Sequence, residues 1–250
     1  MYIPKRLSSL FAAAVVALPS LAEGSDFGMW YGVEVSHKLT QQWSFDANAE
    51  LSNRNNTKTL DSWQLGLEAS YKPVKWLKLS AGYYLKDKNR QEELTMHSDG
   101  QTPNKWTPGY WGLRHRVKVS LTGSIDWGRF SFSLRERYQL TFRPKADGKK
   151  YDVDNDEWDP VKAKTSHTLR SRLQVDYNIP RCKIDPFAGV EMFNGKDGIE
   201  KMRYQVGVVY KWRKQHSFDL TYRYQHYYDS ADDDDNTGEH LIGLGYKYKF

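Results

Sequence analysis

The segment that decides the fold is Trp43-Ser44-Phe45-Asp46-Ala47-Asn48-Ala49-Glu50-Leu51, in which apolar and polar residues alternate strictly. Because successive side chains of a β-strand point to opposite faces, this alternation predicts a strand with one apolar and one polar face. The same pattern recurs along the chain, whereas helical periodicity is absent. The alternation predicts eleven strands, near residues 27–39, 43–54, 62–72, 76–87, 111–122, 129–143, 165–178, 183–193, 201–211, 216–228 and 239–250.

The connections between these segments alternate in length. Short connections fall at residues 40–42, 73–75, 124–128, 179–182 and 212–215, and longer ones at 55–61, 88–110, 144–164, 194–200 and 229–238. Short turns at one end and long loops at the other are typical of an outer-membrane barrel. No linker or change of composition divides the segments, so the sequence predicts a single domain over residues 23–250.

Composition narrows the class of protein. The 250 residues carry a net charge of +6, and the aromatic content of 14% is too high for a disordered chain. Mean hydropathy is −0.79, and the absence of a long apolar run outside the N-terminus excludes a helical membrane bundle. A nucleic-acid binder, a secreted all-β protein and an outer-membrane barrel remain. The single Cys182 excludes a disulfide scaffold and a cysteine-based zinc site.

The N-terminal sequence has the features of an export signal. Lys5 and Arg6 precede a mostly apolar segment over residues 7–18, and Pro19 is followed by the small-residue cleavage sequence Ser20-Leu21-Ala22. This order predicts a secretory signal peptide over residues 1–22, with a buried N-terminal helix as the alternative. Export argues against nucleic acid as a partner.

Alternation alone does not say which face lies inside. A soluble barrel turns its apolar face inward, whereas a membrane barrel turns it toward lipid. The strands are long enough for a tilted crossing, a signal peptide is expected, and aromatic residues lie near strand ends, as interfacial girdles do: Trp43, Trp63, Tyr71, Trp76, Trp111, Trp127, Tyr177 and Trp212. We therefore predict an all-β fold, a single antiparallel up-and-down transmembrane β-barrel of ten to twelve strands, in contact with outer-membrane lipid and lipopolysaccharide.

The C-terminal segment Tyr246-Lys247-Tyr248-Lys249-Phe250 supports the same location. This alternating aromatic strand with a terminal Phe250 resembles the signal read by the barrel-assembly machinery of the outer membrane. The barrel-assembly machinery is therefore an expected partner of the chain.

The number of predicted strands conflicts with the interpretation as a bacterial membrane barrel. Bacterial single-chain barrels normally have an even number of strands, and eleven is odd. Either one segment is miscounted or the first does not cross as a normal strand. We expect ten or twelve strands, and the sequence does not choose between them.

Several segments resemble an uncharacterised family of bacterial outer-membrane barrels, domain of unknown function 2490. The resemblance lies in Trp30-Tyr31-Gly32-Val33 with Trp43-Ser44-Phe45, in Gly82-Tyr83-Tyr84, in the Arg-x-Arg pairs of the middle strands and in the aromatic C-terminus. It covers most of the chain after residue 22. It implies a barrel in the bacterial outer membrane, and it implies no activity and no functional residues.

Basic side chains gather on the polar face of the strands predicted at 111–122, 129–143 and 165–178. With the apolar face toward lipid, they project into the lumen as Arg114, Arg116, Arg135, Arg137, Arg170 and Arg172. Other strands send carboxylates inward: Glu34, Asp46, Glu50, Glu68, Glu191 and Asp219. The interpretation we favour is a filled lumen closed by salt bridges. The alternative is a pathway or site for an anionic solute, because rings of arginine select anions.

Three polar residues, His115, Glu136 and Ser171, interrupt the predicted lipid-facing rows. A hairpin that pairs Leu121 with Phe130 also pairs His115 with Glu136, and the next hairpin can place Glu136 beside Ser171. Serine, histidine and an acid at one level are the elements of a nucleophile site, and outer-membrane phospholipases carry such a site outside a barrel. The His-x-Ser-Asn-Gly-like motif of those enzymes is missing. A β-bulge that turns Glu136 inward and a protein–protein contact are the other interpretations.

Two acidic segments complete the candidates. Residues 152–159 begin like a calcium loop but lack the glycine and the final glutamate, where Ala163 stands, and 232–235 is a run of four aspartates. We expect solvated loops, with weak divalent-ion binding as the alternative. No phosphate-binding, dinucleotide or zinc motif occurs, so we expect no cofactor and no metal. The expected function is structural, or the passage of small solutes through a polar lumen; the alternative is a lipid-modifying hydrolase.

Overall fold

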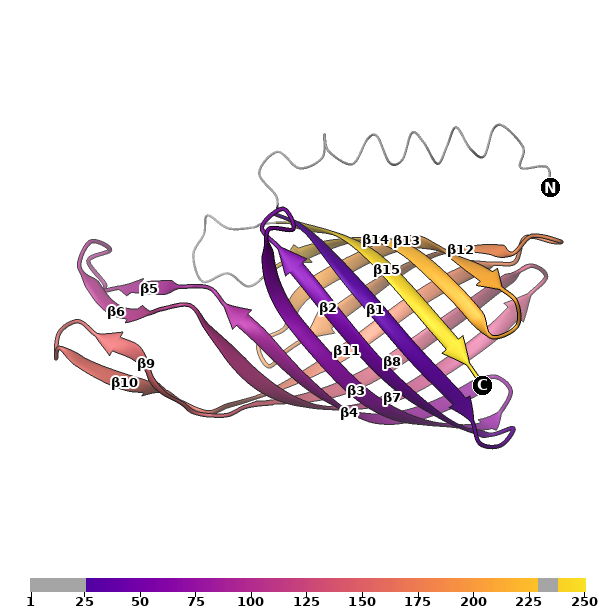
Figure 1. Ribbon diagram of the computed structural model, residues 1–250, viewed down its shortest axis with the longest axis horizontal. Helices are drawn as coiled ribbons and strands as arrows, with labels where there is room; N and C mark the ends of the chain where they lie inside the picture. The colour runs from indigo at the N-terminus through magenta and orange to yellow at the C-terminus, as the bar shows by residue number, and fades with distance from the viewer. Residues whose placement is uncertain (1–25, 229–237) are drawn as a thin grey trace.

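The computed structural model describes residues 26–228 and 238–250. The predicted signal peptide and the aspartate run 232–235 lie outside these residues. Each of the eleven segments predicted from alternation is a strand of one closed barrel (Figure 1): β1 (Asp26–Lys38), β2 (Trp43–Arg54), β3 (Thr59–Val74), β4 (Leu77–Arg90), β7 (Tyr110–Trp127), β8 (Phe130–Arg143), β11 (Lys164–Tyr177), β12 (Ile184–Asn194), β13 (Ile199–Trp212), β14 (His216–Tyr227) and β15 (Gly238–Lys249).

The barrel closes between its first and last strands. β1 pairs with β15 in parallel, from Asp26 opposite Glu239 to Ser36 opposite Lys249, whereas all other neighbouring barrel strands are antiparallel (Figure 1). The expectation of an even number is therefore wrong: the barrel has eleven strands. With an odd count, β1 and β15 run in the same direction, and a parallel ladder, only slightly weaker per residue, still removes both free edges.

The apolar face of the barrel lies outside. Leu67 on β3, Val119 on β7 and Leu173 on β11 are 68%, 51% and 52% exposed, whereas the polar Ser70 and Gln205 face the lumen and are buried. Trp76 and Trp127 are exposed at the short-turn end, and Trp111 is exposed at the long-loop end. This arrangement confirms the predicted orientation, since an apolar band flanked by aromatic girdles suits a bilayer. Within the described residues, no helix is long and apolar enough to cross a membrane.

The two longest predicted loops contain structure that alternation did not indicate. β5 (Glu93–Met96) and β6 (Pro103–Thr107) form one hairpin, and β9 (Ala146–Asp152) and β10 (Glu157–Val161) form another. The hairpins join in a four-stranded sheet that projects beyond the long-loop end of the barrel (Figure 1).

Aromatic contacts link the two hairpins. Trp106 pairs with Tyr151 across β6 and β9, and the Trp158 ring centroid lies 6.0 Å from that of Trp106 and 5.3 Å from that of Tyr151. Such ring pairs contribute about 0.5–1.5 kcal/mol beyond the area they bury. This cluster therefore stabilises a sheet whose strands come from distant parts of the chain.

Candidate functional site

All six arginines predicted to face the lumen do so. They lie on three neighbouring strands, β7, β8 and β11, and line a cavity of about 1090 Å³ at the long-loop end of the barrel. Their positions follow from the pleat, because each pair of arginines is flanked on both sides by apolar residues that point outward. The arginines are half-buried rather than free in bulk water.

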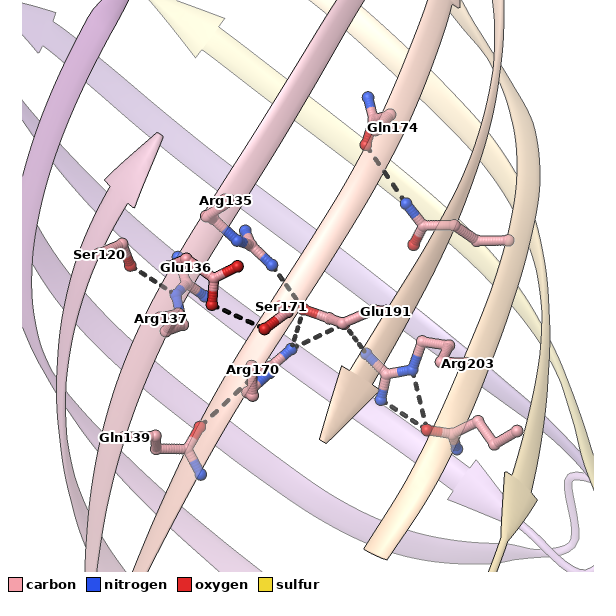
Figure 2. A network of polar contacts seen from close by, with 12 residues as sticks. Ser120, Arg135, Glu136, Arg137, Gln139, Arg170, Ser171, Gln174, Glu191 and Arg203 are labelled. Atoms are coloured by element: carbon pink, nitrogen blue, oxygen red, sulfur yellow. Dashed lines mark hydrogen bonds and ion pairs between the residues drawn. The ribbon is translucent and has the colours of Figure 1, made fainter. Parts of the chain in front are cut away.

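Glu191 on β12 is the centre of the densest polar network in the lumen. Its Oε1 accepts hydrogen bonds from Arg135 at 2.6 Å and from Arg170 at 3.0 Å, and its Oε2 accepts one from Arg203 at 3.2 Å (Figure 2). The Glu191 side chain is 1% exposed. A single carboxylate therefore neutralises one of three guanidinium charges, and the group keeps a net positive charge.

The other carboxylates leave part of the basic surface unpaired. Glu68 lies 3.7 Å from Arg137 and accepts a hydrogen bond from the Tyr84 hydroxyl at 2.6 Å, and Glu34 pairs with Lys247. Glu50, also a predicted partner, makes no hydrogen bond or ion pair with any described residue. Carboxylates inside the barrel therefore neutralise some, but not all, of the basic side chains.

Aromatic rings in the lumen face several of the cations. The Phe193 ring lies 4.4 Å from Arg170, 4.5 Å from the Lys201 ammonium and 4.9 Å from Arg203. The ring quadrupole attracts a cation, so these contacts offset part of the repulsion among like charges. The sequence analysis selected Arg170 but not Phe193, Lys201 or Arg203. The alternation of Arg203 with Tyr204 and Val206 is the same signal that selected the six arginines.

Basic groups outnumber acidic ones around the 1090 Å³ cavity. Fourteen basic and seven acidic side chains line it. Arg114 and Arg172 form no ion pair within the described part of the chain, and their buried Nε–H groups have no hydrogen-bond acceptor there. Buried polar groups are normally hydrogen-bonded, so these guanidiniums are placed to hold water or an anion.

The predicted exterior cluster does not assemble. Ser171 lies opposite Glu136 as predicted, and its hydroxyl donates a 2.6 Å hydrogen bond to the Glu136 carboxylate (Figure 2). The predicted pairing of His115 with Glu136 is wrong, because Leu121 pairs with Glu136 and His115 pairs with Phe142. At about 3.3 Å per residue, this register places His115 about 20 Å along the barrel from Glu136.

The local cause is the turn between β7 and β8. β7 continues to Trp127, so the turn contains only Gly128, with φ of 62°, and Arg129, whereas the sequence analysis placed it over 124–128. The ladders on both sides of Glu136 are regular, so the bulge interpretation is wrong as well. His115 instead contacts the Tyr83 hydroxyl, with 2.6 Å between the oxygen and Nδ1.

The acidic segment 152–159 contains the tight turn between β9 and β10, at residues 153–156. The Asp152 carboxylate accepts hydrogen bonds from the backbone N–H groups of Asp154 and Asn155 and lies 3.3 Å from the Lys105 ammonium. In the neighbouring hairpin, hydrogen bonds from the Thr102 hydroxyl and backbone lower the pKa of Asp99 to about 2. Within the described residues, no group of three or more acidic, histidine or cysteine side chains is arranged to hold a metal ion.

A family model, described as a protein of unknown function (DUF2490), matches residues 27–236. The chain belongs to this family. The resemblance noted in the sequence is therefore confirmed, and the family description assigns no activity. No curated protein matches the sequence.

Three solved structures are similar to the chain to different degrees. The β-domain of the Bordetella autotransporter BrkA is similar with a TM-score of 0.56 and 15% identity, over 85% of this chain and 86% of that one. The KdgM porin has a TM-score of 0.42 and 15% identity, over 77% and 85% of the two chains. A further porin has a TM-score of 0.35 and 12% identity, over 78% of this chain and 56% of its own. The likeness to the BrkA domain shows that the chain has a β-barrel fold.

Proposed function

We propose that the barrel passes small anionic solutes across the outer membrane through its polar lumen. The observation that carries the proposal is the excess of fourteen basic over seven acidic side chains around the 1090 Å³ cavity. Clefts lined by charge of one sign concentrate counter-ions, and rings of arginine select anions. A lumen closed entirely by salt bridges would not leave cavities of 1090 and 490 Å³.

The test is ion selectivity in planar lipid bilayers. With a potassium chloride gradient across the bilayer, we expect the reversal potential of the wild-type barrel to show preference for chloride. The double variant Arg114→Gln, Arg172→Gln should lose much of that preference, because it removes two cavity charges that form no ion pair within the described residues. Neither arginine forms an ion pair with a described residue, so the substitution leaves no carboxylate there without a direct partner, and the variant should still fold.

The matched control is Lys75→Gln, which removes one positive charge from an exposed position in the turn between β3 and β4. It should leave the selectivity unchanged. A wild-type barrel that folds but carries no current, or that prefers potassium, would contradict the proposal and support a structural role.

The C-terminal strand leads to a second prediction, which concerns the assembly of the barrel. We propose that the barrel-assembly machinery recognises the strand ending at Phe250, whose backbone N–H also donates a 2.9 Å hydrogen bond to the Ser36 carbonyl. Phe250→Ala keeps that hydrogen bond and removes only the ring, so it isolates recognition from closure of the β1–β15 seam.

Both Phe250→Ala and deletion of Phe250 should reduce the amount of heat-modifiable, folded barrel in the outer membrane. Refolding of purified Phe250→Ala in detergent should match the wild type, because the lost ring lies at the rim. Normal membrane levels of both variants would rule out the terminal aromatic ring as a recognition element.

A further inference from the structure

The lumen consists of two chambers with opposite charge. The outer chamber, of about 1090 Å³, opens at the long-loop end, and the inner chamber, of about 490 Å³, lies at the short-turn end. The residues common to both chambers form a waist: Trp30, Glu50, Gln64, Lys118, Arg135, Arg137 and Arg172.

The charge changes sign along the barrel axis. Beyond the waist, the outer chamber is lined by ten basic and six acidic side chains. The waist adds four basic side chains and one acidic one. Beyond the waist on the other side, the inner chamber is lined by two basic side chains, Lys78 and Lys247, and by four acidic ones, Glu34, Asp46, Glu68 and Asp219. An anion entering from the long loops is therefore attracted as far as the waist and repelled below it.

Aromatic rings and cations narrow the waist. The Trp30 indole lies so close over β15 that a Cβ on Gly243 would come within 2.0 Å of it, and the Arg223 guanidinium faces the same ring at 4.1 Å. Opposite, Lys118 is 6% exposed, its ammonium lies 3.4 Å from the Tyr84 ring centroid, and it forms no ion pair with a described residue. A buried ammonium with no carboxylate in direct contact is a costly arrangement, which a bound anion would relieve.

Size and charge together indicate the class of ligand. Pockets of roughly 300–1,000 Å³ hold small organic ligands, and the outer chamber, at about 1090 Å³, is slightly larger than that range. Both the attraction in the outer chamber and the repulsion in the inner one scale with the charge of the solute. A monovalent anion therefore experiences a shallow well and a low barrier, whereas a multivalent anion experiences a deep well and a high barrier.

We propose that the outer chamber is a binding site for a small multivalent anion, bearing several phosphate or carboxylate groups, which enters from the long-loop end and is held above the waist. The inference rests on the proposed anion pathway and adds a direction to it: monovalent anions pass, and multivalent anions bind on one side and obstruct the current.

The test measures block of the chloride current by inorganic tripolyphosphate added to one side of a planar bilayer. Cys182, the only cysteine, is exposed in the short turn between β11 and β12, so a membrane-impermeant maleimide identifies which side carries the short turns. We expect the half-blocking concentration to be at least tenfold lower from the long-loop side. Citrate in place of tripolyphosphate distinguishes a carboxylate from a phosphate preference, and the monovalent gluconate should not block from either side.

Two sets of variants separate the chambers. Arg114→Gln with Arg116→Gln should raise the half-blocking concentration at the long-loop side several-fold, whereas Lys75→Gln should not change it. Asp46→Asn with Asp219→Asn lowers the acidic barrier of the inner chamber, so the difference between the two sides should shrink. Block that is equal from both sides, or no block at all, would overturn the inference while leaving the anion pathway standing.

A barrel without any current would refute the pathway but not the binding site. In that case the melting temperature of the folded barrel in detergent tests whether the outer chamber binds the anion. Tripolyphosphate should raise it for the wild type and for Lys75→Gln, and should raise it clearly less for the Arg114→Gln, Arg116→Gln variant. If tripolyphosphate left the wild-type melting temperature unchanged, the proposed binding site would be refuted as well.

Discussion

Replacing Glu191 by glutamine should destabilise the barrel more than any other single substitution in the lumen, by about 3 kcal/mol. Glu191 is 1% exposed and forms ion pairs with Arg135, Arg170 and Arg203. Removing one member of a buried ion pair costs about 3–5 kcal/mol, because the remaining charge is buried and uncompensated. We place the effect at the lower end, because the adjoining chamber has room for water that screens the three arginines. Urea unfolding of the barrel in detergent micelles measures the change in the free energy of unfolding.

Glu50→Gln is the matched control. It removes the same charge from the same lumen, but Glu50 makes no hydrogen bond or ion pair within the described residues, so its removal should cost less than about 1 kcal/mol. Adding Arg170→Gln to Glu191→Gln should recover part of the loss, because one of the repelling cations is then gone. Equal effects of Glu191→Gln and Glu50→Gln would show that the lumen is screened as bulk water and that the network adds no stability.

Leu67→Arg should have the second large effect, a destabilisation of about 2–4 kcal/mol. Leu67 lies midway along β3 and is 68% exposed on the outer face, where a bilayer covers it. An arginine near the midplane must either lose its hydration or distort the bilayer around it. Unfolding from liposomes by guanidinium measures the change, and it must be done in lipid because a micelle adapts to a charged side chain.

Thr168→Arg provides the comparison, because Thr168 lines the outer chamber and its replacement keeps the new guanidinium in a polar cavity. Repulsion from the neighbouring cations should lower the free energy of unfolding of Thr168→Arg, but by clearly less than the loss in Leu67→Arg. Similar losses for the two variants would mean that the exposed apolar face does not contact lipid.

Local patterning was sufficient for much of the fold. The alternation around 43–51 and its repeats placed every barrel strand, because period two is a property of the extended backbone and not of its neighbours. The same alternation put Arg114, Arg137 and Arg170 on the polar face. The strands β5, β6, β9 and β10 were missed. Each hairpin pairs within its own loop, but the contact that joins the two, Trp106 with Tyr151, connects distant parts of the chain.

The sequence by itself determined which residues share a face, which face meets lipid, and that the lumen would be rich in arginine. Only the tertiary structure decided the parallel closure of β1 on β15, the register that separates His115 from Glu136, and the gathering of three arginines on Glu191. The physical reason is common to all three. Alternation specifies a side chain's direction within its own strand, whereas its partners depend on how far each strand slides against the next and on how the sheet meets itself. The same strand registers and barrel closure also separate the basic outer chamber from the acidic inner one.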